Sequence, residues 1–295
     1  MIYYIMLELY KIEGTSNIDP AELLGETYNT SETWPSFQED YTNFKNNIVN
    51  WVGKKESKVI IRIFDGEFHF LKGNKVGNVG TRHCQSFLSP SFIKKFYDGV
   101  LACDILSTQL YKNEMITFNQ LFSPRGIDIP MEFIYSIVAN KWIFKTFKNR
   151  IALIGGEGKI RLIKELMKHD EYRKYIETDM FVDYISVPER FACDNTDEII
   201  SNISNDIIKS SADIFLFGIG ISKMAIAHHF KTIKPAVYLD IGCGVSALAG
   251  TTSISRPYFG SWINYRINGY DYSSVDPIDF EQTKDLNSVY LTPNQ

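Results

Sequence analysis

The sequence predicts an α/β protein built on a doubly wound, mostly parallel β-sheet, and two observations predict it. Runs of β-favouring residues alternate along the chain with segments whose apolar residues recur at helical spacing. The clearest of these helical segments begin directly after glycine-containing turns. Because 295 residues suffice for one large domain, we expect a single Rossmann-like domain with helical insertions.

The individual elements follow from these patterns. A first amphipathic helix is expected at 36–52, where apolar residues recur every three or four positions. Crossover helices are expected at 159–169 and 222–231. Strands are expected at 58–64, 151–154, 181–187, 214–217 and 236–239. We therefore divide the single domain into an N-terminal extension with a helix, a core and an irregular aromatic tail, at 1–57, 58–250 and 251–295.

Charge and cysteine content exclude several classes of protein. Lys and Arg total 31 against 35 Asp and Glu, a formal net charge of -4, and the basic residues form no block, so we expect no nucleic-acid partner. No apolar run approaches the ~18 residues of a membrane span, so we expect no integral membrane segment. The cysteines lie far apart without a CxxC pair, which favours a reducing compartment, and we expect a cytoplasmic protein.

An acidic turn, Asp65-Gly66-Glu67, follows the first predicted strand. Two carboxylates separated by one glycine on a bend can converge on a divalent cation, and ligands of parallel sheets bind at the carboxyl ends of the strands. The alternative is a surface turn with solvated acids. Arg62 on the same strand is expected either to pair with a carboxylate or to contact a phosphate, and the sequence does not separate these roles.

Two glycine turns are candidate phosphate sites, because each follows a strand and opens a helix. Free N–H groups and the positive end of the helix dipole then face an anion. The alternative is that these glycines only permit tight turns. The residues expected to contact a phosphate are Gly155, Gly156 and Lys159 in the first turn, and Gly218, Gly220, Ser222 and Lys223 in the second.

A third glycine turn follows the last predicted strand, in Asp240-Ile241-Gly242-Cys243-Gly244. It looks like the first motif of the class I S-adenosylmethionine methyltransferases, but too few residues follow Gly244 to supply the rest of such a sheet. A methyltransferase that uses this turn is one alternative function. A non-catalytic nucleotide-binding module is another.

The order of these motifs resembles the GT-D-fold glycosyltransferases over residues 58–243. That family has an R-F-G-D-G-E-like first motif, a later strand, glycine turn and helix, and a last strand ending in D-I-G, here at Asp240. Phe64 stands where the family usually has Gly. The resemblance implies a hexosyl- or pentosyltransferase that moves a sugar from a UDP-sugar donor to a hydroxyl of a glycan acceptor, with inversion.

The resemblance also implies roles for single residues. Mn²⁺ or Mg²⁺ is expected at Asp65 and Glu67, which are the candidate metal ligands and the candidate catalytic residues, with either one as the base. Arg62, Gly66 and Asp240 join the glycine turns as candidate donor-binding residues. In the tail, Tyr258, Trp262 and Tyr265 are expected either to stack on a sugar or uracil ring or to pack in the fold.

Overall fold

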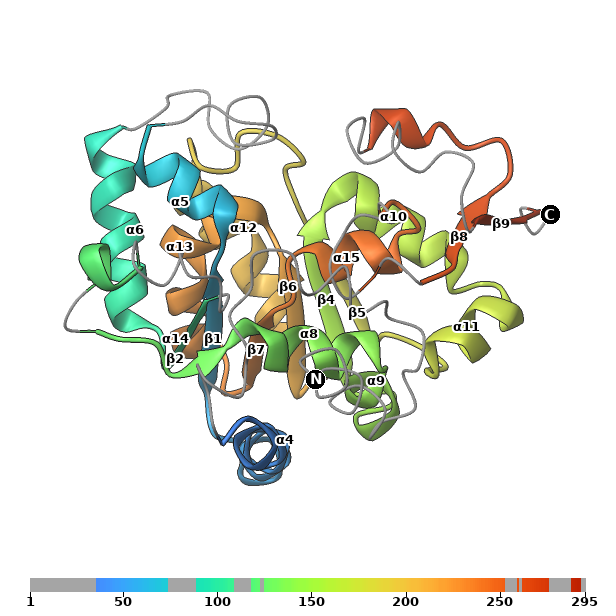
Figure 1. Ribbon diagram of the computed structural model, residues 1–295. Helices are drawn as coiled ribbons and strands as arrows, with labels where there is room; N and C mark the ends of the chain where they lie inside the picture. The colour runs from blue at the N-terminus through green and yellow to red at the C-terminus, as the bar shows by residue number, and fades with distance from the viewer. Residues whose placement is uncertain are drawn as a thin grey trace, which may run out of the picture.

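The protein is described from a computed structural model, which covers residues 36–73, 89–108, 118–122, 125–252, 259, 262–275 and 288–292. Seven strands form one sheet in the order β3-β2-β1-β7-β6-β4-β5, and every pairing in it is parallel (Figure 1). This confirms the predicted parallel α/β fold. The strands are β1 (Lys58–Ile63), β2 (Ile105–Thr108), β3 (Ile129–Pro130), β4 (Ile151–Gly156), β5 (Asp183–Val187), β6 (Ile214–Gly218) and β7 (Val237–Asp240).

Helices cover both faces of the sheet, and each face has its own apolar core. Strand alternation sends Val59 and Ile61 of β1 into one core and Ile60 into the other. The first core is closed by α5 (Asp65–Leu71), α6 (Pro90–Ala102), α12 (Thr196–Lys209), α13 (Lys223–Ile226) and α14 (Phe230–Ile233). The second is closed by α4 (Phe37–Lys54), α8 (Met131–Ala139), α9 (Trp142–Thr146), α10 (Glu157–Leu166), α11 (Asp170–Ile176) and α15 (Cys243–Leu248).

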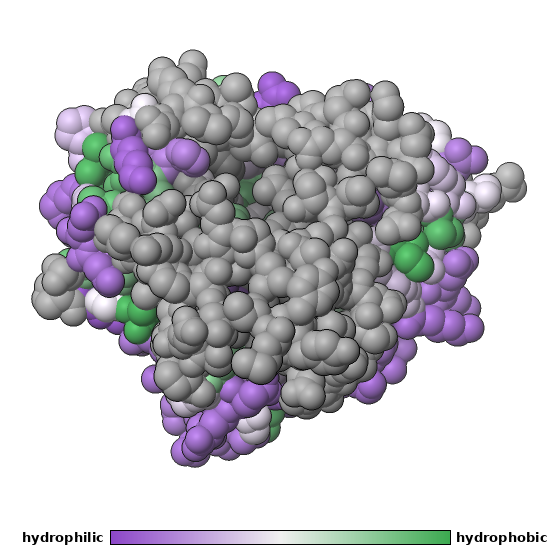
Figure 2. Space-filling view, viewed as in Figure 1, coloured by the Kyte–Doolittle hydropathy of each residue, from purple (hydrophilic) through white to green (hydrophobic). Residues whose placement is uncertain are grey.

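Helix α4 is the amphipathic helix that the sequence predicts. Its buried residues Phe37, Tyr41, Phe44, Ile48 and Val52 follow the three- and four-residue spacing of one helix face. The opposite face is polar, and hydrophilic side chains gather over α4 at the lower edge of the molecule in Figure 2. Burial of the apolar stripe against α8 therefore holds this helix on the face of the sheet that carries the second core.

Several elements differ from the sequence prediction. Strands β2 and β3 were not predicted, since β2 has only two apolar residues before Ser107 and Thr108, and β3 has only two residues. The helix expected at 222–231 is broken into the 3₁₀ turn η2 (Gly220–Ser222), α13, the 3₁₀ turn η3 (Ala227–His229) and α14. The tail was expected to be irregular, yet its described residues contain the parallel strands β8 (Asn264–Ile267) and β9 (Ser288–Leu291).

Strands β4 and β6 are neighbours whose connections leave in opposite directions. After β4 the chain runs through α10 and α11 to β5 at the edge of the sheet, whereas after β6 it runs through α13 and α14 to β7 near the centre. Helices α10 and α13 also lie on opposite faces. Such a reversal opens a crevice at the carboxyl ends of the two strands, where ligands of open α/β sheets bind.

Candidate active site

Four buried charged side chains meet at the carboxyl ends of the central strands. Arg62 is at the end of β1, Asp240 at the end of β7, Glu67 in the first turn of α5 and Lys223 at the start of α13. Their exposed fractions are 3%, 0%, 4% and 3% in that order. Each of the four is a candidate from the sequence. The fold brings them together although Arg62 and Asp240 are 178 positions apart in the chain.

Arg62 and Asp240 form the first half of this network. The guanidinium Nη2 lies 3.1 Å from Asp240 Oδ1, and Nε donates to the Asp240 carbonyl oxygen at 2.9 Å. The backbone N–H groups of Arg62 and Gly242 donate to the same carboxylate, at 3.1 and 3.0 Å. Arg62 also donates to the hydroxyl of Tyr135 on α8. Of the two roles that the sequence left open for Arg62, the structure shows the carboxylate partner.

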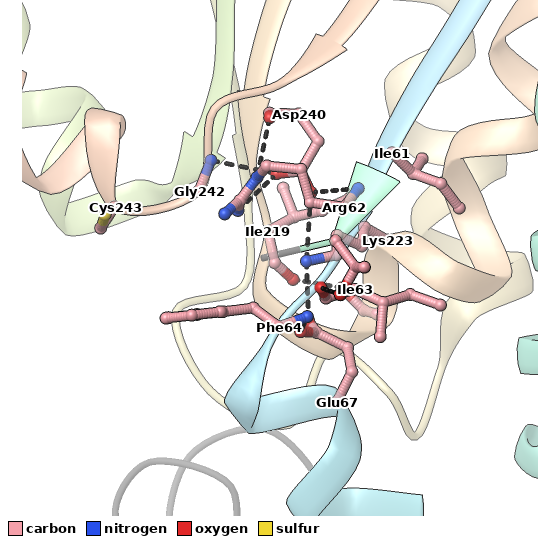
Figure 3. A network of polar contacts seen from close by, with 12 residues as sticks. Ile61, Arg62, Ile63, Phe64, Glu67, Ile219, Lys223, Asp240, Gly242 and Cys243 are labelled. Carbon is pink, nitrogen blue, oxygen red and sulfur yellow. Dashed lines mark hydrogen bonds and ion pairs between the residues drawn. The ribbon is translucent and has the colours of Figure 1, made fainter. Parts of the chain in front are cut away.

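Lys223 forms the second half. Its Nζ lies 2.7 Å from Glu67 Oε1 and 3.1 Å from Asp240 Oδ2, so one ammonium joins two carboxylates (Figure 3). The other oxygen of Glu67 accepts the backbone N–H of Phe64 at 2.9 Å, which caps the start of α5. Burial raises the pKa of Asp240, but Arg62 and Lys223 outweigh burial and hold that pKa below its ordinary value.

The network carries no net charge, and Glu67 is not available to bind a further cation. Two positive and two negative side chains are paired, and both carboxylate oxygens of Glu67 have partners. An ammonium 2.7 Å away repels a divalent ion at the same carboxylate, so Glu67 as arranged does not fit a direct metal ligand. The side chain of Asp65 lies outside the described part of the chain. Among the described residues, no group of three or more His, Cys, Asp or Glu side chains is arranged to hold a metal ion.

The two glycine turns converge on one crevice, at the reversal between β4 and β6. Gly156 and Lys159 line it from the first turn, and Gly218, Gly220 and Ser222 line it from the second. This inner compartment has a volume of about 80 Å³, room for a phosphate group but not for a nucleotide, whose pockets measure roughly 300–1,000 Å³.

The inner compartment adjoins the charge network. Ser222 lines the crevice, and the next residue, Lys223, belongs to the network. Asp240 of β7 is in register with Phe217 of β6. The residue after Phe217 is Gly218, which is in register with Gly155 of β4. The network and the crevice are therefore neighbouring parts of one edge of the sheet.

Glu189, which the sequence reasoning missed, lies at the mouth of the crevice. It follows β5 and its Oε2 accepts the backbone N–H of Gly158 at 3.3 Å, in the first turn of α10. A Cβ at Gly156 would meet the Glu189 carboxylate, so the glycine leaves room for this side chain. The only signal in the sequence is its place, two residues beyond a strand at the ligand-binding edge.

Several candidate glycines are required by the local backbone and packing. A Cβ at Gly218 would lie 2.6 Å from the Gly242 carbonyl oxygen, and one at Gly155 would lie 3.1 Å from Val245. Gly220 has φ +60°, a backbone conformation that favours glycine. Gly66 lies in the first turn of α5. These positions therefore set the shape of the sheet edge, whatever binds there.

Gly242, in the turn that resembles a methyltransferase motif, is covered by Arg62. Its φ is +44°, and a Cβ there would collide with the guanidinium of Arg62. The place where a cofactor would approach this glycine is thus filled by the chain itself.

The tail aromatics pack in the fold. Trp262 and Tyr265 are each 6% exposed and make edge and tilted ring contacts with Tyr175. Tyr258 lies outside the described residues. Of the two roles expected for the described rings, the structure shows packing.

Comparisons with known proteins give a weak likeness. No protein-family model and no curated protein matches the chain. One solved structure, of domain of unknown function 1792, is 12% identical with a TM-score of 0.44 over 67% of this chain and 76% of its own. A second, described as a new glycosyltransferase of that family from Streptococcus sanguinis, is 12% identical with a TM-score of 0.46 over 68% and 80%. A third, described as having a distinct glycosyltransferase fold, is 12% identical with a TM-score of 0.44 over 65% and 74%.

Likeness at this level does not place the chain in a family.

Among the described residues, no helix has both the length and the apolar character needed to cross a membrane.

Proposed function

We propose that this chain is a glycosyltransferase that moves a sugar from a UDP-sugar donor to a hydroxyl group of a glycan acceptor, with inversion at the anomeric carbon. The observation that supports it best is the convergence of both glycine turns on the crevice between β4 and β6. A nucleotide diphosphate is the ligand class that such crevices accommodate. The choice of UDP and of inversion is what the sequence resemblance to the GT-D-fold glycosyltransferases implies.

In this proposal, one phosphate group of the donor enters the inner compartment. Gly156, Gly218 and Gly220 line this compartment, so their backbone can approach an anion there, beside the Glu189 carboxylate that accepts the N–H of Gly158. Lys159, whose Nζ lies 2.9 Å from the hydroxyl of Ser246, adds a positive charge at the wall. The compartment holds a phosphate group, and the rest of the donor extends outward.

Glu189 is the carboxylate best placed to accept the proton of the attacking hydroxyl. It lines the inner compartment and is half-buried, so it can reach both a bound donor and solvent. Glu67 is engaged by Lys223 and Phe64, so we assign it the role of positioning the turn before α5. Asp65 is the other catalytic candidate from the sequence. It lies at the same edge of the sheet, and we keep it as a candidate catalytic residue.

We include a dependence on Mn²⁺ or Mg²⁺ in the proposal, and the sequence resemblance is its only support. A divalent ion would neutralise the departing diphosphate. Because Glu67 does not fit such an ion as a direct ligand, Asp65 is the residue of the acidic turn left to bind it.

The experiment that tests the proposed function is thermal unfolding with candidate ligands. A ligand at about 100 times its dissociation constant stabilises the folded state by about 2.7 kcal/mol, which raises the melting temperature visibly. We expect UDP with Mn²⁺ to raise it and S-adenosylmethionine to leave it unchanged. A shift with S-adenosylmethionine and none with UDP contradicts the proposal and favours the methyltransferase.

A further inference from the structure

A second, wider pocket opens beside the inner compartment. It has a volume of about 440 Å³, within the roughly 300–1,000 Å³ of ligand pockets, and shares Pro188 and Glu189 with the inner compartment. We call it the outer compartment. Its polar side chains are Arg161, Arg190, Glu157, Glu189, Tyr270 and Ser274.

The two arginines of the outer compartment come from different elements. Arg161 is on α10 and Arg190 follows β5, and both are exposed. Across the described part of the chain, neither makes a hydrogen bond or an ion pair. Because guanidinium groups bind phosphate and carboxylate in a two-pronged geometry, two unpaired arginines at one pocket form a site for an anion.

The remaining groups fit the hydroxyl-bearing part of a sugar. The carboxylates of Glu157 and Glu189 balance the arginines in charge and accept hydrogen bonds from hydroxyl groups. Tyr270 is half-buried, so part of its ring stays open to the apolar face of a ligand. A simple anion would use the arginines alone, whereas a sugar with an anionic group uses all of these side chains.

We propose that the outer compartment binds the acceptor, and that the acceptor is an acidic sugar, one that carries a phosphate or a carboxylate. This inference rests on the proposed function. With a donor phosphate group in the inner compartment, Glu189 lies between the two ligands, where the acceptor hydroxyl attacks. The new bond joins the acceptor oxygen to the anomeric carbon, the bond from that carbon to the donor phosphate breaks, the electron pair leaves with UDP, and Glu189 takes the hydroxyl proton.

Calorimetry with three probes tests the acceptor class: glucose 1-phosphate, glucuronate and glucose, each titrated into the full chain with and without UDP. We expect one of the anionic sugars to bind at least about tenfold more tightly than glucose, and their order tells which anion the arginines prefer. Arg161→Gln and Arg190→Gln should each weaken that binding by about tenfold or more. Lys209→Gln, which removes an exposed cation from α12, is the control and should change nothing.

Three results overturn the inference. Equal binding of all three probes, or no binding of any, removes the preference for an acidic sugar. Arginine variants that bind glucose 1-phosphate and glucuronate as the wild type does place the anion elsewhere. Arginine variants that lose the melting shift caused by UDP show that the outer compartment holds the donor. A wild type that binds UDP but no acidic sugar keeps the proposed function, whereas a wild type without a UDP shift loses the function itself.

Discussion

Lys223 and Glu67 form an ion pair of 2.7 Å, with only 4% and 6% of their side chains exposed. The same ammonium reaches Asp240, which in turn holds Arg62, so four chain segments are tied together at the ligand-binding edge of the sheet. Removing one member of such a buried group leaves an uncompensated charge in the interior. Loss of one member should therefore destabilise the sheet edge that carries the crevice.

Lys223→Met should lower the free energy of unfolding by about 3–5 kcal/mol, because the buried carboxylate of Glu67 then loses its cation and Arg62 alone faces two negative charges. Urea unfolding measures it. The control is Lys94→Met, which breaks an exposed pair with Asp98 and should cost less than about 1 kcal/mol. Equal, small losses in the two variants would contradict the structural role of the network.

Glu67→Gln and Asp65→Asn should separate the two carboxylates of the acidic turn. Glu67 is paired to Lys223, so its variant should lose stability and keep any melting shift that Mn²⁺ produces. Asp65→Asn should remove that shift, since the proposal leaves Asp65 as the metal ligand. A Mn²⁺ shift that survives in Asp65→Asn and disappears in Glu67→Gln would reverse the assignment.

Glu189→Gln should lower sugar transfer by roughly 10²–10⁴-fold, the usual contribution of a general base, while the melting shift with UDP remains. Glu198→Gln is the control, because it removes an exposed carboxylate from α12 that lines neither the inner nor the outer compartment. Transfer rates and UDP shifts are measured on both variants. Full activity in Glu189→Gln would exclude it as the base.

Gly242→Ala should destabilise the fold by more than about 2 kcal/mol, since it forces alanine into a positive φ and displaces Arg62 from Asp240. Gly53→Ala in α4 is the contrasting change. Nothing lies within 4 Å of a Cβ there, so it should stabilise the helix by about 0.5–1 kcal/mol. If Gly242→Ala is as stable as the wild type, Arg62 does not hold the position described.

His228 should make stability depend on pH between 6.5 and 4. Burial, then the neighbouring His229 and Lys231, lower its pKa from 6.5 to about 4, against the opposing charge of Asp98. The unfolded chain then binds more protons in this range, so the free energy of unfolding falls as pH drops from 6.5 to 4. The ring is partly exposed, which limits the loss to about 1–2 kcal/mol.

His228→Gln should flatten this part of the pH profile, measured by urea unfolding at a series of pH values. An unchanged slope in the variant would assign the pH dependence to other groups.

The fold was predictable where the sequence carries long apolar runs. The strands β1 and β4 to β7 have such runs, and the sequence analysis found all of them. Strand β3 is only Ile129 and Pro130, and a proline at the sheet edge gives no strand signal. The helix after β6 breaks at η3, where sequence spacing alone predicts a continuous helix.

The sequence singled out Arg62, Glu67, Lys223 and Asp240 as candidate residues, but it did not show which of them pair. Their pairing depends on which strands are neighbours, and β1 lies beside β7 only because the last strand of the sheet is inserted at its centre. Glu189 carried no motif, since a single Glu after a strand is ordinary until the fold shows that it faces a crevice.

The most direct test of the proposed donor site is a crystal structure of the protein with UDP bound. We predict a phosphate group of UDP in the inner compartment, against the backbone of Gly156, Gly218 and Gly220, with Arg62 still paired to Asp240. A nucleotide bound over Gly242 with Arg62 displaced, or a diphosphate away from both glycine turns, would contradict the proposed donor site.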